Sequence, residues 1–288
     1  MSECIAFHSY KGGTGKTTIA ANLAAILTVK GYNVALLDLD VYAPSLQSYF
    51  EVAPAKWIND LLSDNADVKD VMVDMTSKVQ KYGNPSGQIG KLWIGFSNPQ
   101  KEEVYKLEGG GKQTQPKIQL LRKFIQMREE LISNFDSNYV ILDTSPGIRY
   151  WSINSLAIAD TLFLTLKFGE LDIEGTRKMA SDIYSSFTKF GAKSYLLLNR
   201  VGGYCVPNTL IIPNSHEVAD SAVTVPQLDE AELARSLSKE VDMEFISAIP
   251  CYCDIQFSRK EFLTVLQYPN HPFAKQLERL ANAKQIKV

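Results

Sequence analysis

The sequence predicts an α/β fold in which a doubly wound, mostly parallel central sheet carries helices on both faces. Two patterns predict it. Short, near-continuous apolar runs recur along the chain, as strands covered on both faces require. Longer stretches with helical spacing of apolar residues separate these runs, and this alternation is typical of strands joined by crossover helices.

The predicted elements follow one another in a regular order. The predicted strands, which share the apolar runs, are Cys4–Ser9, Asn33–Asp38, Tyr139–Asp143, Thr161–Leu166, Lys193–Leu198 and Glu244–Ala248, with a further strand-like run at Leu92–Phe96. The predicted helices are Thr17–Lys30, Ile118–Phe135, Asp172–Phe190, Arg259–Leu266 and Pro272–Ala283. A strand, a glycine-rich loop and a helix therefore open the chain.

The length and composition indicate one folding unit. A chain of 288 residues with 45% hydrophobic content is long enough for one large core, so we expect a single domain over residues 1–288. Two segments, at about 49–115 and 206–240, interrupt the alternation and are predicted to be insertions at the edge of the sheet. The triple glycine Gly109–Gly111 follows no apolar strand, which indicates a flexible loop rather than a phosphate site.

Charge and cysteine usage limit the classes of protein that the chain fits. A formal net charge of -2 argues against a broadly basic surface for nucleic acid. The chain has four cysteines and no charged-then-apolar leader, so we expect a soluble protein of the reducing cytoplasm. The longest mostly apolar stretch, Thr18–Val29, is well short of the roughly 20 residues that a membrane span needs.

The segment Lys11–Thr18, with the sequence Lys-Gly-Gly-Thr-Gly-Lys-Thr-Thr, carries the clearest chemistry. A loop that holds phosphates needs glycines so that backbone N–H groups can approach the oxygens, a lysine to meet the charge and a hydroxyl for magnesium. This segment supplies all three and predicts a nucleotide site. The residues that form it are Gly12, Gly13, Thr14, Gly15, Lys16, Thr17 and Thr18.

The loop departs from the standard phosphate-loop pattern at its beginning. The pattern places a glycine five residues before Gly15, where this chain has Tyr10, and a second lysine stands beside it at Lys11. Lys-Gly-Gly-x-Gly-Lys-Thr-Thr resembles the deviant phosphate loop of the ParA/MinD family of ATPases. The resemblance implies a P-loop fold of that type, ATP and Mg²⁺ as cofactors, and a homodimer that sandwiches two ATP molecules, in which Lys11 reaches the partner's nucleotide.

Carboxylates follow two of the predicted strands, at the strand ends where α/β sheets bind ligands. Asp38-Leu39-Asp40 resembles the first switch segment of the ParA/MinD family, and Asp143, followed by Thr144-Ser145-Pro146-Gly147, resembles the second. The resemblance implies that Asp40 positions the attacking water and that Gly147 senses the γ-phosphate. It assigns Thr17, Asp38 and Asp143 to magnesium, and Thr18 to the neighbourhood of the α-phosphate. The candidate catalytic residues are Lys11, Lys16 and Asp40.

The residues after the strand Lys193–Leu198 bear on the identity of the base. GTPases usually read guanine there with Asn-Lys-x-Asp, whereas this chain has Asn199-Arg200-Val201-Gly202. The missing carboxylate favours adenine, and Asn199 and Arg200 resemble the adenine-contacting pair of the ParA/MinD family. By the same resemblance, the chain near Pro250 passes along the base.

The resemblance implies an ATP-dependent switch of the ParA/MinD type, used in partitioning or spatial positioning, with an activating partner protein. DNA is one candidate surface for the dimer, through scattered cations such as Arg177, Lys178, Lys189 and Lys193. A membrane is a weaker candidate, because the apolar residues of Pro272–Ala283 recur at core-facing spacing and only a short tail follows.

Two other classes are alternatives. The segment Asp38–Ser45 also resembles the switch of an Mrp-type iron–sulfur cluster carrier, and Cys251 and Cys253 could bind metal. That class carries Cys-x-x-Cys, whereas this Cys-x-Cys is predicted to lie on an extended stretch, so a cluster is disfavoured. An ArsA-like targeting ATPase would need an apolar client-binding subdomain, which neither insertion resembles.

Two further features lie near the site. His8, on the first predicted strand, is predicted to be a packed residue rather than a catalytic base. Arg149, Tyr150 and Trp151 follow the second switch segment, where they fit either an effector or dimer contact or the core.

Overall fold

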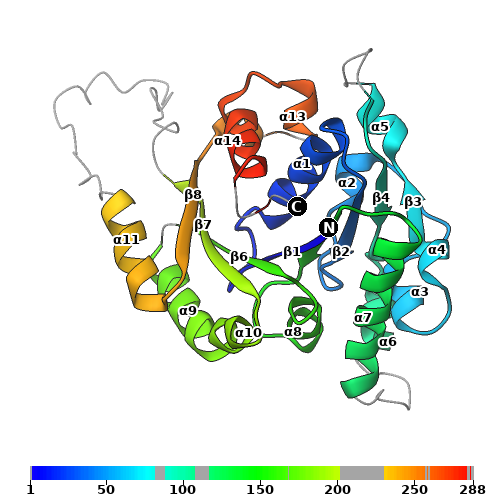
Figure 1. The fold of residues 1–288 in the computed structure, drawn as a ribbon, viewed down its shortest axis with the longest axis horizontal. Helices are drawn as coiled ribbons and strands as arrows, with labels where there is room; N and C mark the ends of the chain where they lie inside the picture. The colour runs from blue at the N-terminus through cyan, green and yellow to red at the C-terminus, as the bar shows by residue number, and fades with distance from the viewer. Residues whose placement is uncertain are drawn as a thin grey trace, which may run out of the picture.

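The computed structural model describes residues 2–81, 88–107, 117–167, 169–201, 230–256, 258, 260–283 and 286. Within these residues the chain forms one eight-stranded sheet of order β3-β4-β2-β5-β1-β6-β7-β8, flanked by helices on both faces (Figure 1). Only the β3–β4 pair, at one edge, is antiparallel. The predicted α/β fold with a mostly parallel sheet is confirmed.

The strands are short and mostly buried. They are β1 (Glu3–His8), β2 (Val34–Leu39), β3 (Met72–Asp74), β4 (Leu92–Gly95), β5 (Tyr139–Thr144), β6 (Thr161–Leu166), β7 (Lys193–Val201) and β8 (Glu244–Pro250). The apolar runs predicted all of them except β3. Every residue of β2, β5 and β6 is buried, as a strand covered on both faces requires.

The helices on either side of the sheet are α1 (Lys16–Val29), α2 (Gln47–Phe50), α3 (Ile58–Leu62), α4 (Val68–Val71), α5 (Thr76–Gln80), α6 (Lys101–Leu107), α7 (Lys117–Ser133), α8 (Tyr150–Leu156), α9 (Glu170–Met179), α10 (Ser185–Lys189), α11 (Glu230–Val241), α12 (Cys253–Gln256), α13 (Thr264–Gln267) and α14 (Pro272–Ala281). A single π-helical turn, η1 (Ala180–Tyr184), joins α9 to α10.

The sheet separates two hydrophobic clusters. On one face, α1, α13 and α14 cover Ile5 and Phe7 of β1. On the other face, α7, α8, α9 and α11 cover Cys4 and Ala6 of the same strand. This alternation follows from the two-residue period of a strand, and it places β1 at the centre of both clusters (Figure 1).

Parallel pairing brings the carboxyl-terminal ends of the central strands β1, β2 and β5 together along one edge of the sheet, perpendicular to its outer strands. β1 pairs with β5 and β6, and β2 pairs with β5, with Asp38 opposite Asp143. The loop that follows β1 therefore lies between the ends of strands that come from distant parts of the sequence. This edge is where an α/β sheet binds ligands.

The helix predictions differ from the structure in several places, and the short helices α2–α6, α8 and α12 were not predicted. The predicted helix Asp172–Phe190 is divided by the π turn into α9, η1 and α10. The predicted helix Arg259–Leu266 is wrong over most of its length, because only α13 is helical there. Helix α11 was not predicted: it lies largely within the segment 206–240 and packs against β8 and α9 like an ordinary crossover helix.

Other parts of the predicted insertions have different outcomes. Within 49–115, β4 is the predicted strand-like run and pairs with β2 in the main sheet. The triple glycine Gly109–Gly111 and residues 206–229 lie outside the described residues. No helix in the described parts of the chain is both long and apolar enough to cross a membrane.

Candidate nucleotide site

Glycines shape the loop between β1 and α1. Gly15 directly precedes α1 with a φ of 84°, and Gly13 has a φ of 72°, a left-handed conformation that residues with a side chain rarely adopt. A Cβ at Gly15 would also come within 2.3 Å of the Asn199 amide nitrogen. The loop therefore needs glycine at these positions, and its backbone N–H groups are free to face a ligand at the helix N-terminus.

Lys16 is held inside the loop. Its side chain is only 6% exposed, and Nζ donates a hydrogen bond of 2.8 Å to the Ser9 hydroxyl. Ser9 in turn donates to the Lys11 carbonyl at 2.6 Å. Burial lowers the pKa of Lys16, while the Asp143 and Asp40 carboxylates act in the opposite direction. The result is an ammonium that is already positioned and partly desolvated.

Neighbouring strands fix the rest of the loop. The Thr14 and Thr165 hydroxyls lie 3.2 Å apart, and Asn199 donates its side-chain N–H to the Thr14 carbonyl at 2.7 Å. At the start of α1, the Thr18 hydroxyl lies 2.8 Å from the Tyr49 hydroxyl. The loop is therefore attached to the ends of β6 and β7 as well as to its own helix.

Asp38 and Asp143 lie side by side under the loop, each 1% exposed. Asp38 accepts backbone N–H groups from Asp40 at 3.1 Å and from Leu46 at 3.2 Å. Neither carboxylate oxygen of Asp143 has a hydrogen-bond partner among the described residues. A buried carboxylate without partners is costly, so these oxygens point to a group that the protein itself does not supply.

The pKa values of the two carboxyls reflect this burial. Burial raises the pKa of Asp143 to about 7, although the Lys16 charge acts in the opposite direction. Burial, followed by the negative charges of Asp143 and Asp40, raises the pKa of Asp38 well above its usual value. A cation bound between them would offset the repulsion of these charges.

The chemistry of the donors fits magnesium. The Thr17 hydroxyl accepts a 3.3 Å hydrogen bond from the Ser45 hydroxyl, so the end of the loop and the first switch segment meet there. Together with Asp38 and Asp143 it offers the oxygen donors that Mg²⁺ prefers. These are the residues that the sequence assigned to the metal, and the fold brings them together.

The two predicted switch segments also contact the loop and each other. Asp40 is half-buried, and its side chain accepts the Ala43 backbone N–H at 3.2 Å. Gly147, with a φ of 79°, donates its backbone N–H to the Ser9 carbonyl at 2.8 Å. The Arg149 guanidinium lies 4.1 Å from the centroid of the Tyr42 ring, which joins the second segment to the first.

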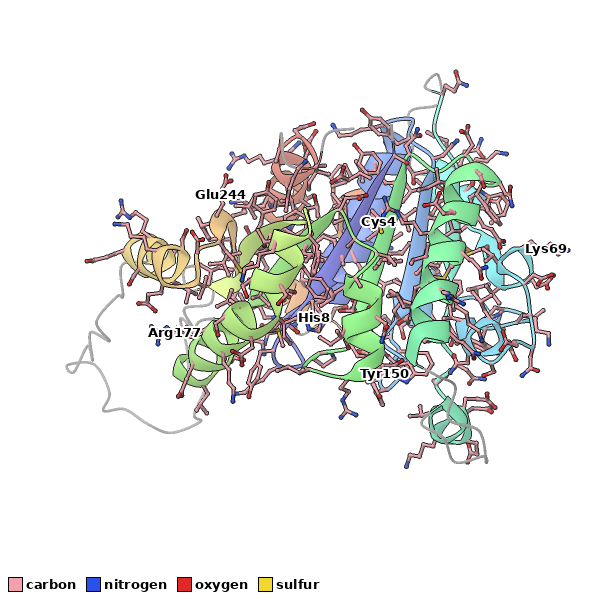
Figure 2. The ribbon with its side chains drawn as sticks, turned by 60° about the horizontal axis from the view of Figure 1, so that its bottom comes forward. Cys4, His8, Lys69, Tyr150, Arg177 and Glu244 are labelled. Atoms are coloured by element: carbon pink, nitrogen blue, oxygen red, sulfur yellow. The ribbon has the colours of Figure 1, made fainter. Side chains whose placement is uncertain are left out.

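The sequence left open whether Arg149, Tyr150 and Trp151 form an effector or dimer contact or belong to the core. Trp151 is 8% exposed and belongs to the core, whereas Tyr150 is 39% exposed at the start of α8 (Figure 2). Arg149 itself is exposed and lies on the Tyr42 ring. Arg149 and Tyr150 therefore present a surface beside the second switch segment, and Trp151 does not.

His8 is fully buried at the end of β1, and its prediction as a packed residue is confirmed (Figure 2). Its Nδ1 lies 2.7 Å from the Thr144 hydroxyl, which donates its own proton to the Phe7 carbonyl. Nδ1 must therefore carry the proton of the neutral ring. Burial, together with the Lys16 charge, lowers the pKa of His8 to about 3.

A small cavity of about 70 Å³ lies beside Gly15 and Thr18, and it is lined by Asn199, Arg200 and Pro250 among others. The three predicted base-side residues therefore lie around one cavity next to the phosphate loop. Arg200 has a φ of 58°, and its backbone N–H bonds to the Asn199 side-chain oxygen at 2.9 Å. This hydrogen bond helps to aim the Asn199 amide nitrogen at the loop.

Sequence reasoning missed several residues around this site. Ser9 holds Lys16, Tyr49 holds Thr18, and Glu261 lines the base-side cavity. Ser9 adjoins the motif and could have been considered as a partner of its lysine. No local pattern marks the other two, because tertiary folding alone brings them to the loop.

Three predicted residues, Lys11, Cys251 and Cys253, lie apart from these contacts. Lys11 is half-exposed, and its ammonium makes no hydrogen bond or ion pair with any part of the chain that the structure describes. Cys251 and Cys253 are not joined in a disulfide, and Cys253 begins α12, so the predicted extended stretch does not include both cysteines. The Cys251 thiol donates to the Gln256 side-chain oxygen at 3.0 Å.

Comparison with known proteins places this site in a family. A family model described as an AAA domain matches residues 2–192, more than half of the chain. The septum site-determining protein MinD of Pyrococcus horikoshii, solved with Mg-ADP, matches over 98% of this chain and 95% of its own, with a TM-score of 0.66 and 18% identity. The sporulation initiation inhibitor Soj of Bacillus subtilis is 26% identical over 64% of this chain and 65% of its own.

The chain belongs to the ParA/MinD family of P-loop ATPases. The prediction made from the loop with two lysines is confirmed, and the same phosphate-loop fold accounts for the sheet order and the buried lysine.

One expectation needs correction. An iron–sulfur cluster carrier protein of Aquifex aeolicus is 59% identical over 35% of this chain and 24% of its own length. The sequence argument that disfavoured a cluster is therefore not supported. The chain covers less than two thirds of the length of either curated relative named here, so their whole activities are not transferred to it.

Proposed function

We propose that this ATPase is a switch that dimerises when it binds ATP and separates after hydrolysing it to ADP and phosphate. The observation that carries the proposal is the contrast between the two lysines of one loop. Lys16 is buried and bonded to Ser9, ready for the phosphates of its own nucleotide, whereas Lys11 is half-exposed and its ammonium has no partner among the described residues. A second cation outside the phosphate cradle suits a nucleotide held by another copy.

Magnesium has a suitable set of donors in this proposal. Thr17 and Asp143 would hold the ion, and Asp38 would hold a water bound to it. The unpartnered oxygens of Asp143 support this arrangement. When bound, the ion neutralises charge on the phosphates. Lys16 and the backbone N–H groups of the loop bind the phosphates themselves.

Asp40 and Gly147 respond to the third phosphate in this proposal. Asp40, half-buried at the end of the first switch segment, orients the attacking water. Gly147 bonds to the Ser9 carbonyl, directly before the phosphate loop, so a change in the loop reaches the second segment. Loss of the γ-phosphate would then release both segments and weaken the dimer.

The ATP-bound dimer would act in partitioning or spatial positioning in the cytoplasm, with an activating partner protein. The likeness to the chromosome-partitioning ATPase Soj of Treponema pallidum, 25% identical over 61% of this chain, supports this role. DNA remains a candidate surface, although Arg177, one of the predicted cations, forms an ion pair with Glu240. The iron–sulfur carrier is the second candidate, supported by the Aquifex relative.

The rate of ATP hydrolysis per chain tests the proposal. In the wild type the rate should rise with protein concentration as dimers form, and Lys11→Ala should remain slow over the whole range. The Ser9 bond goes to the Lys11 carbonyl, so this variant leaves the loop's internal hydrogen bond in place. Equal rates in wild type and Lys11→Ala would overturn the proposal.

Ligands added in the same assay distinguish DNA binding, membrane binding and the iron–sulfur carrier from one another. DNA, liposomes and an iron–sulfur reconstitution mixture are tested one at a time. Binding of the ATP-state protein to DNA or liposomes names the surface. Retention of a cluster by the reconstituted protein, without binding to either surface, would replace the positioning role with the carrier.

A further inference from the structure

Lys167 is a third lysine beside the phosphate loop, and neither the loop motif nor the switch segments include it. It follows β6, which runs parallel to β1 with His8 opposite Leu164. Its side chain reaches the loop, because Nζ lies 3.2 Å from the position that a Cβ on Gly13 would occupy. The ammonium is therefore within van der Waals distance of the loop's outer turn.

The local geometry explains why the side chain points there. Thr165, two residues earlier, faces the loop, and its hydroxyl lies 3.2 Å from that of Thr14. Side chains two residues apart along an extended chain share a face, so Lys167 faces the loop as well. The contact between Thr165 and Thr14 fixes the distance between β6 and the loop, and this holds Lys167 beside Gly13.

The charge of Lys167 has no counterpart among the residues that the structure describes. The residue is half-buried, yet its ammonium forms no hydrogen bond or ion pair with the residues that the structure describes. Gly12 and Gly13 are exposed, whereas Thr14 and Lys16 are buried, so Lys167 lies at the open rim of the loop. An unpartnered cation beside a phosphate-binding loop is suited to a phosphate oxygen.

We propose that Lys167 binds a phosphate group of the nucleoside triphosphate, as a third lysine of this site. The inference rests on the proposed function, because it requires a nucleotide at the loop. Its position at the rim admits two sources of the same chemistry: the phosphates of the protein's own nucleotide, or those of the nucleotide held by a partner copy.

The test measures two quantities on Lys167→Met, which keeps the length and apolar stem of the side chain. The first is the affinity of the dilute protein for Mg-ADP and for Mg-ATPγS by titration calorimetry. The second is the dissociation constant of the ATP-bound dimer by sedimentation. Lys167→Arg tests whether the charge suffices, and Lys69→Met, on α4 far from His8 and the site, is the matched control (Figure 2).

Loss of a charged hydrogen bond should weaken the affected equilibrium by about tenfold. Weaker nucleotide affinity in the dilute protein indicates contact with its own phosphates, and weaker dimerisation alone indicates the partner's. Unchanged values for both would overturn the inference. A loss shared by Lys167→Arg, with a lower Tm in both variants, would also overturn it, since that pattern indicates a structural role.

The wild type separates this inference from the proposed function. If the wild type binds ATP and stays monomeric, the dimer proposal fails while the affinity measurement still tests Lys167. If the wild type dimerises and Lys167→Met behaves like it in both measurements, only the inference fails.

Discussion

The phosphate half and the base half of the site are built differently. β1, β2 and β5 pair in uninterrupted register, and their ends carry the loop and both buried carboxylates. The β7–β8 ladder has two register shifts, one of them between Asn199 and Val201 at the base-side cavity. Regular strands position charged side chains for phosphate, whereas an irregular ladder presents an amide and backbone groups for the base. We therefore expect substitutions in the phosphate half to have the larger effects.

Lys16→Ala should have the largest effect of the changes considered. Its ammonium is the buried cation at the phosphates, and its removal also leaves Ser9 without its donor. We expect the affinity for ADP to fall by about 100-fold, from lost charged hydrogen bonds. Titration calorimetry of the purified protein measures it.

Lys11→Ala is the control for that experiment, because it removes a lysine from the same loop without touching the cradle. Its affinity for ADP should stay within about twofold of wild type, since a charge without a close partner contributes little. Equal losses in the two variants would remove the distinction between an inner and an outer lysine.

Asn199→Ala should have an intermediate effect in the base half. The substitution leaves the Thr14 carbonyl without its 2.7 Å donor and removes the amide that borders the cavity. We expect the affinity for ATP to fall by about five- to tenfold, and the preference for ATP over GTP to fall with it. Competition binding with both nucleotides measures the two values.

The matched control for Asn199→Ala is Asn134→Ala, at an exposed position just after α7. It should change neither affinity. A loss of ATP affinity in Asn199→Ala that leaves the ratio of ATP to GTP unchanged would show that Asn199 supports the loop without reading the base.

His8→Asn should have the smallest effect, confined to acid pH. The folded pKa of His8, about 3, is lower than the ordinary value of 6.5, so the neutral ring is favoured in the fold. Above pH 6.5 this costs nothing, and as pH falls below 6.5 the unfolded chain takes up a proton that the folded chain does not. At pH 5 the linkage removes about 2 kcal/mol of stability.

Asn can replace the Nδ1–H donor to Thr144 without titrating, so His8→Asn should lose less stability than wild type between pH 7.5 and pH 5. Urea unfolding at the two pH values measures the difference. An equal loss in both proteins would indicate that His8 titrates normally in the folded state.

The site residues that the sequence predicted differ from those it missed in whether their requirement is local. The loop, Asp38 and Asp143 were predicted because each requirement is local: a glycine, a charge or a strand end at fixed spacing. Lys167 and Tyr49 were not predicted, since a lysine after a strand and a tyrosine in a short helix occur in many roles. Only the pairing of β6 with β1 brings Lys167 to the loop.

The boundaries of the elements show the same limit. The apolar runs predicted seven of the eight described strands to within a few residues, because mostly buried strands leave a strong apolar pattern. Of the predicted helix Arg259–Leu266, only the part within α13 is helical, although Leu263, just before α13, is also buried in the cluster that includes α1. Apolar spacing indicates which residues are buried and does not fix the local conformation.

The central claim is that ATP joins two copies through Lys11. The direct measurement is the molar mass of Asp40→Ala, in which we expect hydrolysis to be blocked, by size-exclusion chromatography with light scattering. The account predicts twice the chain mass with ATP, a single chain with ADP, and a single chain with ATP when Lys11→Ala is added. Asp40→Ala that binds ATP and still elutes as a single chain would contradict the account.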